Sequence, residues 1–147
     1  DIGGAFINQV LQEFCEIHEN CYLFDSLGSR KYLSMLAGCK VVIGNSSSGI
    51  YEAPAFRIPT INIGNRQNGR VKAKSIVDCK PNKEEIVKAI KMVQSNSFTK
   101  KLKNMKIPFE GGKTAEKILE KIVQVVENKI NLQKGFYDIY FKTDIEK

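Results

Sequence analysis

The sequence has 147 residues, 42% of them hydrophobic and 27% charged, which is typical of one globular domain and excludes a disordered or fibrous chain. It contains no apolar stretch near the roughly 18 residues of a membrane span, and no basic segment leading into an apolar one, so we expect no membrane partner and a cytoplasmic location. The formal charge of +7 favours an anionic partner, but the scattered lysines lack interleaved aromatic residues, so we expect no nucleic-acid binding.

The first half of the chain alternates between helical and strand-like patterns. Apolar residues recur at helical spacing over residues 6–17, which predicts an amphipathic helix. A short apolar run at 21–24 predicts a strand, and a helix that ends at Gly38 follows it. The β-branched run at 41–43 predicts a strand buried on both faces of a parallel sheet. A helix is expected next, over residues 47–56.

The same alternation continues in the second half. Residues 59–63 predict another strand, residues 65–70 a polar loop, and residues 75–78 a further strand. Asn82, with Glu85 three positions later, has the form of a capping box that opens a helix. We therefore expect a helix after the last strand, with an apolar stripe on one face that consists of Ile86, Val87, Ile90 and Val93.

A Pro- and Gly-containing break at residues 108–112 precedes the last long helix, for which Thr114 is the expected N-cap. Strands and helices that alternate at this spacing predict an α/β fold with a Rossmann-like parallel sheet. We expect a single domain over residues 1–147. Such a domain normally begins with a strand, and this sequence has no leading strand. We therefore expect the domain to be N-terminally truncated and part of a longer protein.

Serines and glycines gather directly after the strand at 41–43. In a parallel α/β sheet, ligands bind at the carboxyl ends of strands, and a helix N-terminus there attracts anions. Gly44 and Gly49 would allow close backbone approach, while Ser46 and Ser47 would add hydroxyl donors. A simple helix cap explains the serines equally well. The pattern matches neither the Walker motif nor G-x-G-x-x-G.

Two charged residues extend this candidate anion site. Glu52 is expected on the same helix as the serines, where a carboxylate can accept hydrogen bonds from the two hydroxyls of a ribose. Arg66 follows the next strand, and its planar guanidinium suits a phosphate. A favourable charge near a helix start and an ordinary surface arginine are the competing interpretations.

The cysteines and the histidine do not indicate a metal site. Cys15, Cys21, Cys39 and Cys79 contain no Cys-x-x-Cys pair, and only His18 could join them. We interpret the cysteines as reduced, mostly buried thiols and His18 as a surface residue. The sequence thus predicts neither a metal nor a cofactor.

Three stretches of the sequence form a recognisable set of motifs. The central stretch joins residues 44–54, which read GNSSSGIYEAP, to residues 59–70, which read PTINIGNRQNGR. The other two are residues 25–38 and residues 107–113. Together these stretches resemble a known family, the hydrolysing UDP-N-acetylglucosamine 2-epimerases of sialic-acid-type sugar biosynthesis. The resemblance covers most of the chain.

The resemblance implies that the chain is the C-terminal half of a GT-B type enzyme with two Rossmann-like domains. By position, Ser46 and Ser47 would hold the diphosphate of a UDP-sugar, Glu52 the ribose and Arg66 the phosphate, with Leu27 at uracil. The implied reaction converts UDP-N-acetylglucosamine and water to UDP and N-acetylmannosamine.

The resemblance also implies what this chain lacks. The catalytic acid and base groups of the family belong to the missing N-terminal domain, so we expect no catalytic residue here and an inactive fragment. We expect the tail at residues 131–147 to pack on a partner domain, and a homo-oligomer is left open. A GT-B glycosyltransferase domain and a non-catalytic nucleotide-binding module are the alternative functions.

Overall fold

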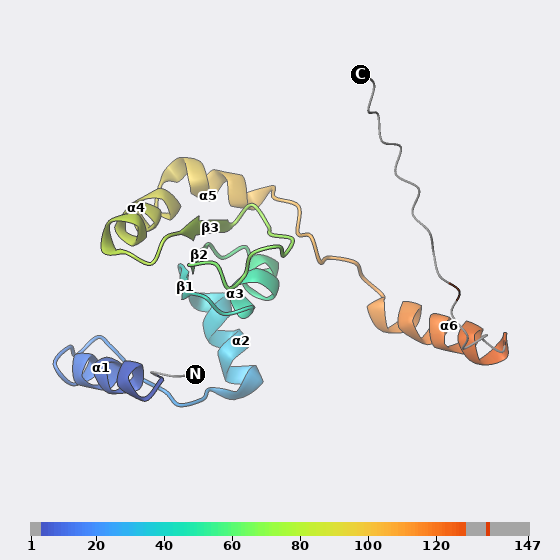
Figure 1. Cartoon of the computed structure of the whole chain (residues 1–147). Coiled ribbons are helices and arrows are strands. Elements are labelled where there is room, and N and C mark those ends of the chain that lie inside the picture. The colour runs from blue at the N-terminus through green and yellow to red at the C-terminus, as the bar shows by residue number, and fades with distance from the viewer. Residues whose placement is uncertain (1–3, 129–134, 136–147) are drawn as a thin grey trace, which may run out of the picture. The chain divides into compact units, whose positions relative to one another are not determined.

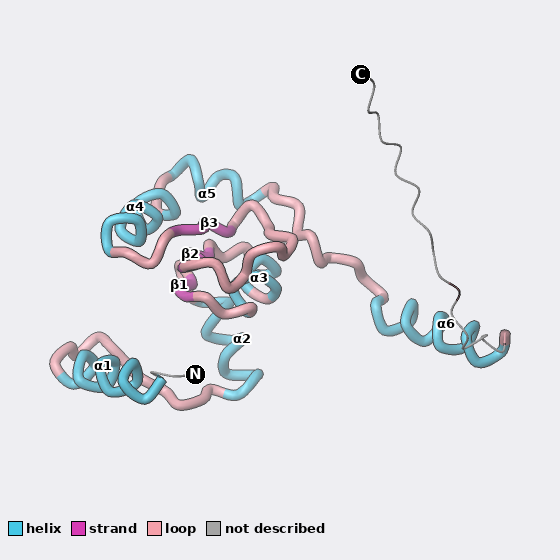
Figure 2. Tube along the Cα trace, viewed as in Figure 1, coloured by secondary structure: helices cyan, strands magenta, loops and turns pink. Residues whose placement is uncertain are grey.

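The computed structural model describes residues 4–128 and Gly135, in two compact units that divide after Glu110 (Figure 1). The helices are α1 (Gly4–Glu16), α2 (Gly28–Gly38), α3 (Ser48–Tyr51), α4 (Lys83–Val93), α5 (Asn96–Lys103) and α6 (Thr114–Glu127). A 3-10 turn, η1 (Ala53–Phe56), follows α3, and the strands are β1 (Val42–Gly44), β2 (Thr60–Ile63) and β3 (Ile76–Cys79). Figure 2 separates these elements from the loops. The predicted packing of the tail at 131–147 lies outside the described residues, apart from Gly135.

A parallel sheet of order β1-β2-β3 lies at the centre of the first unit. Val42 pairs with Thr60 and Gly44 with Asn62, while Thr60 pairs in turn with Ile76. The carboxyl ends of all the strands therefore lie at one edge of the sheet. The prediction of an α/β fold with a Rossmann-like parallel sheet is confirmed.

The core lies between the sheet and α4, as the apolar stripe of that helix predicts. The prediction that the strand at 41–43 is buried on both faces is wrong, because Ile43 on β1 is 47% exposed. Ile61 on β2 is fully buried against Ala89 and Val93 of α4. The predicted capping box opens this helix, because the Asn82 side chain accepts a hydrogen bond from the Glu85 N–H at 2.9 Å. The core therefore fixes β2 in place, and β2 leads directly to the candidate site.

The predicted helix over 47–56 is two shorter elements, α3 and η1. Pro54 causes the break, since proline has no N–H with which to continue the α-helical hydrogen bonds. After η1, Arg57 takes the left-handed conformation with φ 58°, and its guanidinium donates to Leu102 O at 3.0 Å and Met105 O at 3.3 Å. These bonds join the β1–β2 crossover to the end of α5.

Two local predictions were wrong, and one helix was missed. Residues 21–24 form no strand, because within the described part of the chain β1 pairs only with β2 and no ladder reaches this segment. The helix α5 was not predicted, although Ser95 caps it by accepting from the Phe98 N–H at 3.3 Å. Thr114 lies inside α6, whose N-cap is Lys113 in a left-handed conformation with φ 51°.

The amphipathic helices predicted near both ends of the chain are α1 and α6. Neither helix has a buried residue. Their apolar stripes are exposed in this chain, with Phe6 at 69% and Val126 at 72% exposure. Among the described helices, none combines the length and apolarity needed to cross a membrane.

Candidate functional site

Residues 44–49 lead from the end of β1 into the start of α3 and form a tight turn, which we call the serine turn. It begins at Gly44, whose φ of 149° favours glycine. The Ser46 hydroxyl accepts from the Ser48 N–H at 3.3 Å, and both Ser46 and Ser47 are exposed. Within the described residues, the N–H groups of Ser46 and Ser47 have no acceptor. The turn thus offers backbone and hydroxyl donors to a ligand.

Gly49 anchors the serine turn directly on β2. A Cβ at this position would lie 2.6 Å from the Thr60 Cγ2, closer than real Cβ contacts allow. The Thr60 hydroxyl donates to the Gly49 carbonyl at 2.9 Å, and Thr60 is buried. No larger residue fits here without moving the turn, so the close approach requires glycine.

Arg66 lies in the loop that follows β2, at the same edge of the sheet as the serine turn. The adjacent Gln67 is only 2% exposed, and its Nε2 donates to the Asn45 carbonyl at 2.6 Å. This bond holds the loop against the serine turn, while the Arg66 side chain is exposed. The structure therefore brings the segments of Ser46, Ser47 and Arg66 together, as the sequence predicted.

Glu52 was predicted in the N-terminal part of a longer helix, and it lies instead at the C-cap of the short helix α3. Its N–H donates to the Ser48 carbonyl at 2.9 Å, which places it about one helical turn from the serine turn. Its side chain is exposed and makes no hydrogen bond or ion pair to the described residues. The carboxylate is available to a ligand.

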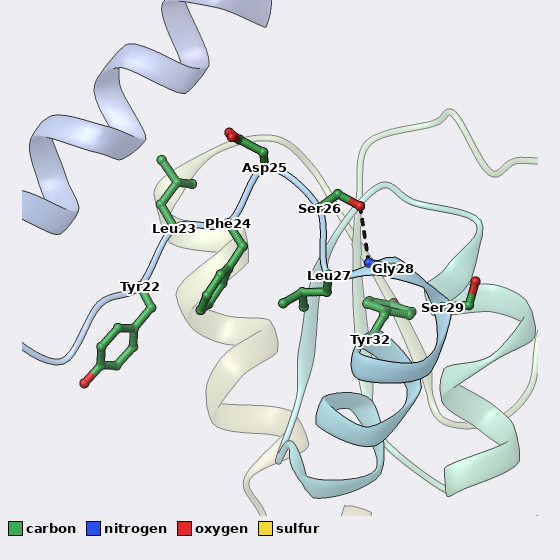
Figure 3. A pocket seen from close by; sticks show the side chains of 9 residues that line it. All are labelled: Tyr22, Leu23, Phe24, Asp25, Ser26, Leu27, Gly28, Ser29 and Tyr32. Atoms are coloured by element: carbon green, nitrogen blue, oxygen red, sulfur yellow. Dashed lines mark hydrogen bonds between the residues drawn. The ribbon is translucent and has the colours of Figure 1, made fainter.

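Leu27 lines a pocket of about 620 Å³ formed by the segment that enters α2 (Figure 3). Its wall is built by Tyr22, Leu23, Phe24, Asp25, Ser26, Leu27, Gly28, Ser29 and Tyr32. The Ser26 hydroxyl accepts from the Gly28 N–H at 3.3 Å and shapes the turn, as the dashed line in Figure 3 marks. A volume of several hundred cubic ångströms suits a small organic ligand.

Tyr32 connects this pocket to the serine turn. Its side chain lines the pocket, and its hydroxyl forms a hydrogen bond with the Ser48 hydroxyl at the start of α3. The sequence does not indicate this contact, because Tyr32 falls among the apolar residues that recur along the helix predicted to end at Gly38. A ligand that enters the pocket near Leu27 would therefore lie next to the donors of the serine turn.

The motif around Arg66 makes a further contact through Arg70. Its guanidinium carbon lies 5.4 Å from the ring centre of Tyr51, the last residue of α3. Tyr51 also packs on Phe109 with ring centres 4.8 Å apart. Both Arg70 and Phe109 belong to stretches that carried the family resemblance. Through Tyr51 they contact the end of α3, which Glu52 directly follows.

A second pocket of about 550 Å³ lies beside β3 and contains none of the predicted site residues. Partial burial would raise the pKa of Asp78 there, but hydrogen bonds from Lys72 and Asn62, each 2.7 Å long, outweigh it and lower the pKa. Asp78 is thus an ionised structural acceptor at neutral pH and no proton donor.

The cysteines are half-buried free thiols, less buried than predicted. Burial raises the pKa of the Cys39 and Cys79 thiols, which keeps both protonated and unreactive at neutral pH. His18 is exposed, as expected, and stacks on Phe14. No cluster of three metal-ligating side chains occurs among the described residues.

Comparison with known proteins identifies related sequences and folds. A family model described as UDP-N-acetylglucosamine 2-epimerase matches residues 3–123. The GDP/UDP-N,N'-diacetylbacillosamine 2-epimerase (hydrolyzing) of Campylobacter jejuni is 41% identical over 140 residues, covering 95% of this chain and 36% of that protein. The polysialic acid biosynthesis protein P7 of Escherichia coli is 34% identical over 139 residues, covering 95% of this chain and 35% of the relative.

One solved structure supports the fold. It is a crystal structure from Listeria monocytogenes, described as a candidate UDP-N-acetylglucosamine 2-epimerase, with a TM-score of 0.66 at 18% identity. The match covers 90% of this chain and 36% of that one, which agrees with a fragment of a GT-B type fold. The chain thus spans about a third of the length of the curated relatives described above.

Proposed function

Because this chain belongs to the UDP-N-acetylglucosamine 2-epimerase family, we propose that it is the UDP-binding part of a hydrolysing UDP-sugar 2-epimerase. The observation that carries the proposal is the contact between Tyr32 and Ser48. It joins a residue that lines the pocket at Leu27 to Ser48, which belongs to the serine turn. A nucleoside diphosphate carries a flat base and an anionic diphosphate, which the ribose joins. The pocket would suit the base, and the donors of the serine turn would suit the diphosphate.

The serine turn would bind the diphosphate. Ser46 and Ser47 offer N–H groups that have no acceptor in the described part of the chain, together with exposed hydroxyls, and oriented N–H groups stabilise phosphate oxygens. Arg66 would pair with the phosphate from the neighbouring loop, which Gln67 holds against the turn. The two phosphates would then be bound from two adjacent crossovers.

The nucleoside would occupy the pocket at Leu27. The apolar side chain of Leu27 would cover uracil, and the turn formed by Ser26 and Gly28 would present backbone groups to the base edge. Glu52 would accept hydrogen bonds from the ribose hydroxyls with its free carboxylate. In this arrangement all five residues predicted from the sequence contact UDP, and the sugar extends away from the domain.

The proposed reaction is completed by the rest of the protein. Loss of the C2 proton and cleavage of the C1–O bond release UDP as the leaving group, and water then adds to the resulting glycal to give the C2 epimer. Here the serine turn and Arg66 would stabilise the charge that develops on departing UDP. The acid and base groups would lie outside this chain, so the fragment alone is expected to be inactive.

The sugar is a 2-acetamido sugar in this proposal. UDP-N-acetylglucosamine, which would yield N-acetylmannosamine, is the substrate implied by the family description. UDP-N,N'-diacetylbacillosamine is the second candidate, because the relative named for it is 41% identical to this chain. Both carry the UDP group that this chain would bind.

The test is an incubation of the full-length protein with each UDP-sugar in the absence of any acceptor. We expect release of free UDP together with the 2-epimerised free sugar from one of the two substrates, measured by chromatography and NMR. A strict requirement for an acceptor would point to a GT-B glycosyltransferase. UDP binding without turnover would point to a non-catalytic nucleotide-binding module.

A further inference from the structure

We infer that Gln67 is a positioning residue that directs the Ser46 N–H toward the diphosphate. The inference rests on the proposed function and adds to it a residue that itself makes no contact with the ligand. Gln67 donates its Nε2 to the Asn45 carbonyl at 2.6 Å, across 22 positions of sequence. It is the side chain that joins the loop of Arg66 to the serine turn.

The planarity of the peptide bond gives this contact its consequence. The Asn45 carbonyl and the Ser46 N–H belong to one rigid trans peptide and point in opposite directions. Because Gln67 holds the carbonyl on its own side, the Ser46 N–H must point away from Gln67. That N–H has no acceptor among the described residues, and Ser46 itself is exposed. It is therefore free to meet an anion at the carboxyl edge of the sheet.

Burial of Gln67 argues that its amide serves more than folding. The residue is 2% exposed, yet its Oε1 has no hydrogen-bond partner among the described residues. A buried oxygen without a partner costs free energy, so an apolar side chain of similar size would fit this site at little loss of stability. What an apolar residue would lose is the Nε2 donor, and with it the fixed direction of the Asn45 peptide.

The same bond sets the place of Arg66. Gln67 follows Arg66 directly, and the loop begins at Gly64 with φ 78°, a conformation that favours glycine. With Gln67 anchored on Asn45, the backbone at Arg66 cannot move away from the serine turn independently. One buried amide thus positions two hydrogen-bond donors to the phosphates, the Ser46 N–H and the Arg66 guanidinium.

The test compares UDP with uridine, titrated into the 147-residue chain and followed by NMR. Gln67→Met keeps the length of the side chain and removes the donor. We expect the affinity for UDP to fall about five- to tenfold, while the affinity for uridine changes less than twofold. The difference arises because only UDP has the phosphates whose hydrogen-bond donors lose their alignment. The amide resonance of Ser46 should also shift in the free variant. Gln94→Met, the same substitution at the exposed C-cap of α4, should leave both affinities unchanged.

The outcomes separate this inference from the proposed function. If wild type binds UDP more tightly than uridine and Gln67→Met does so equally well, the inference is overturned and the proposed function stands. An equal loss of affinity for UDP and uridine would show a general structural role for Gln67 and would also overturn the inference. Wild type that binds UDP no better than uridine would overturn both.

Discussion

Replacing Ser46 and Arg66 together by alanine is expected to lower the affinity of this chain for UDP roughly 30- to 150-fold, about 2–3 kcal/mol. Each substitution removes a donor to the diphosphate, and hydrogen bonds to charged groups are worth about twice as much as neutral ones. The figure allows for solvent screening, because both side chains are exposed. Isothermal titration calorimetry with UDP measures the loss.

The matched control is Ser97→Ala with Lys101→Ala on α5. This pair also removes one hydroxyl and one positive charge from exposed positions, so any effect of the formal charge of +7 on a dianionic ligand is the same in both double variants. Affinity should change less than twofold in the control. Equal losses in the two double variants would mean that UDP is attracted by net charge alone, and the assignment of Ser46 and Arg66 would be wrong.

Gly49→Ala is expected to destabilise the chain by about 1–3 kcal/mol and to weaken UDP binding as well. The new Cβ would lie 2.6 Å from Thr60 Cγ2, and Thr60 is a buried, β-branched residue with little freedom to move. The serine turn would have to lift from β2, which disturbs the donors of Ser46 and Ser47. Urea unfolding gives the stability, and titration with UDP gives the affinity.

Thr60→Ser provides the rescue. Serine lacks Cγ2 but keeps the hydroxyl that donates to the Gly49 carbonyl at 2.9 Å. Combined with Gly49→Ala, it should recover most of the lost stability and affinity, whereas two independent losses would simply add. Additive losses in the double variant would show that the close approach of Gly49 to Thr60 does not determine the position of the turn.

The fold was predictable where local pattern and tertiary environment agree. The strand near residues 41–43 and the apolar stripe of α4 lie close to where the sequence predicted. Only the helix is buried as predicted, because Ile43 on β1 is 47% exposed. The run at 21–24 has the composition of a strand, but a strand also needs a partner ladder, which the described part of the chain does not supply. Composition alone does not reveal this lack.

The candidate site was predictable for residues whose chemistry is visible in the sequence. Ser46, Ser47 and Arg66 follow adjacent strands, and parallel pairing brings the ends of those strands to one edge. Gln67 and Tyr32 were missed, because their roles depend on tertiary contacts. A glutamine in a polar loop is expected to be exposed, yet Gln67 is buried beneath the serine turn. Tyr32 was hidden in an apolar stripe that predicts core packing.

An NMR titration with UDP measures where the nucleotide binds in this chain. The amide resonances that shift should be those around Leu27, those of the serine turn at residues 44–49, and those beside Arg66. Saturating shifts confined to these segments are the predicted result. Shifts centred on the second pocket beside β3, or none at all up to millimolar UDP, would contradict the proposal that this chain holds the nucleotide of a UDP-sugar.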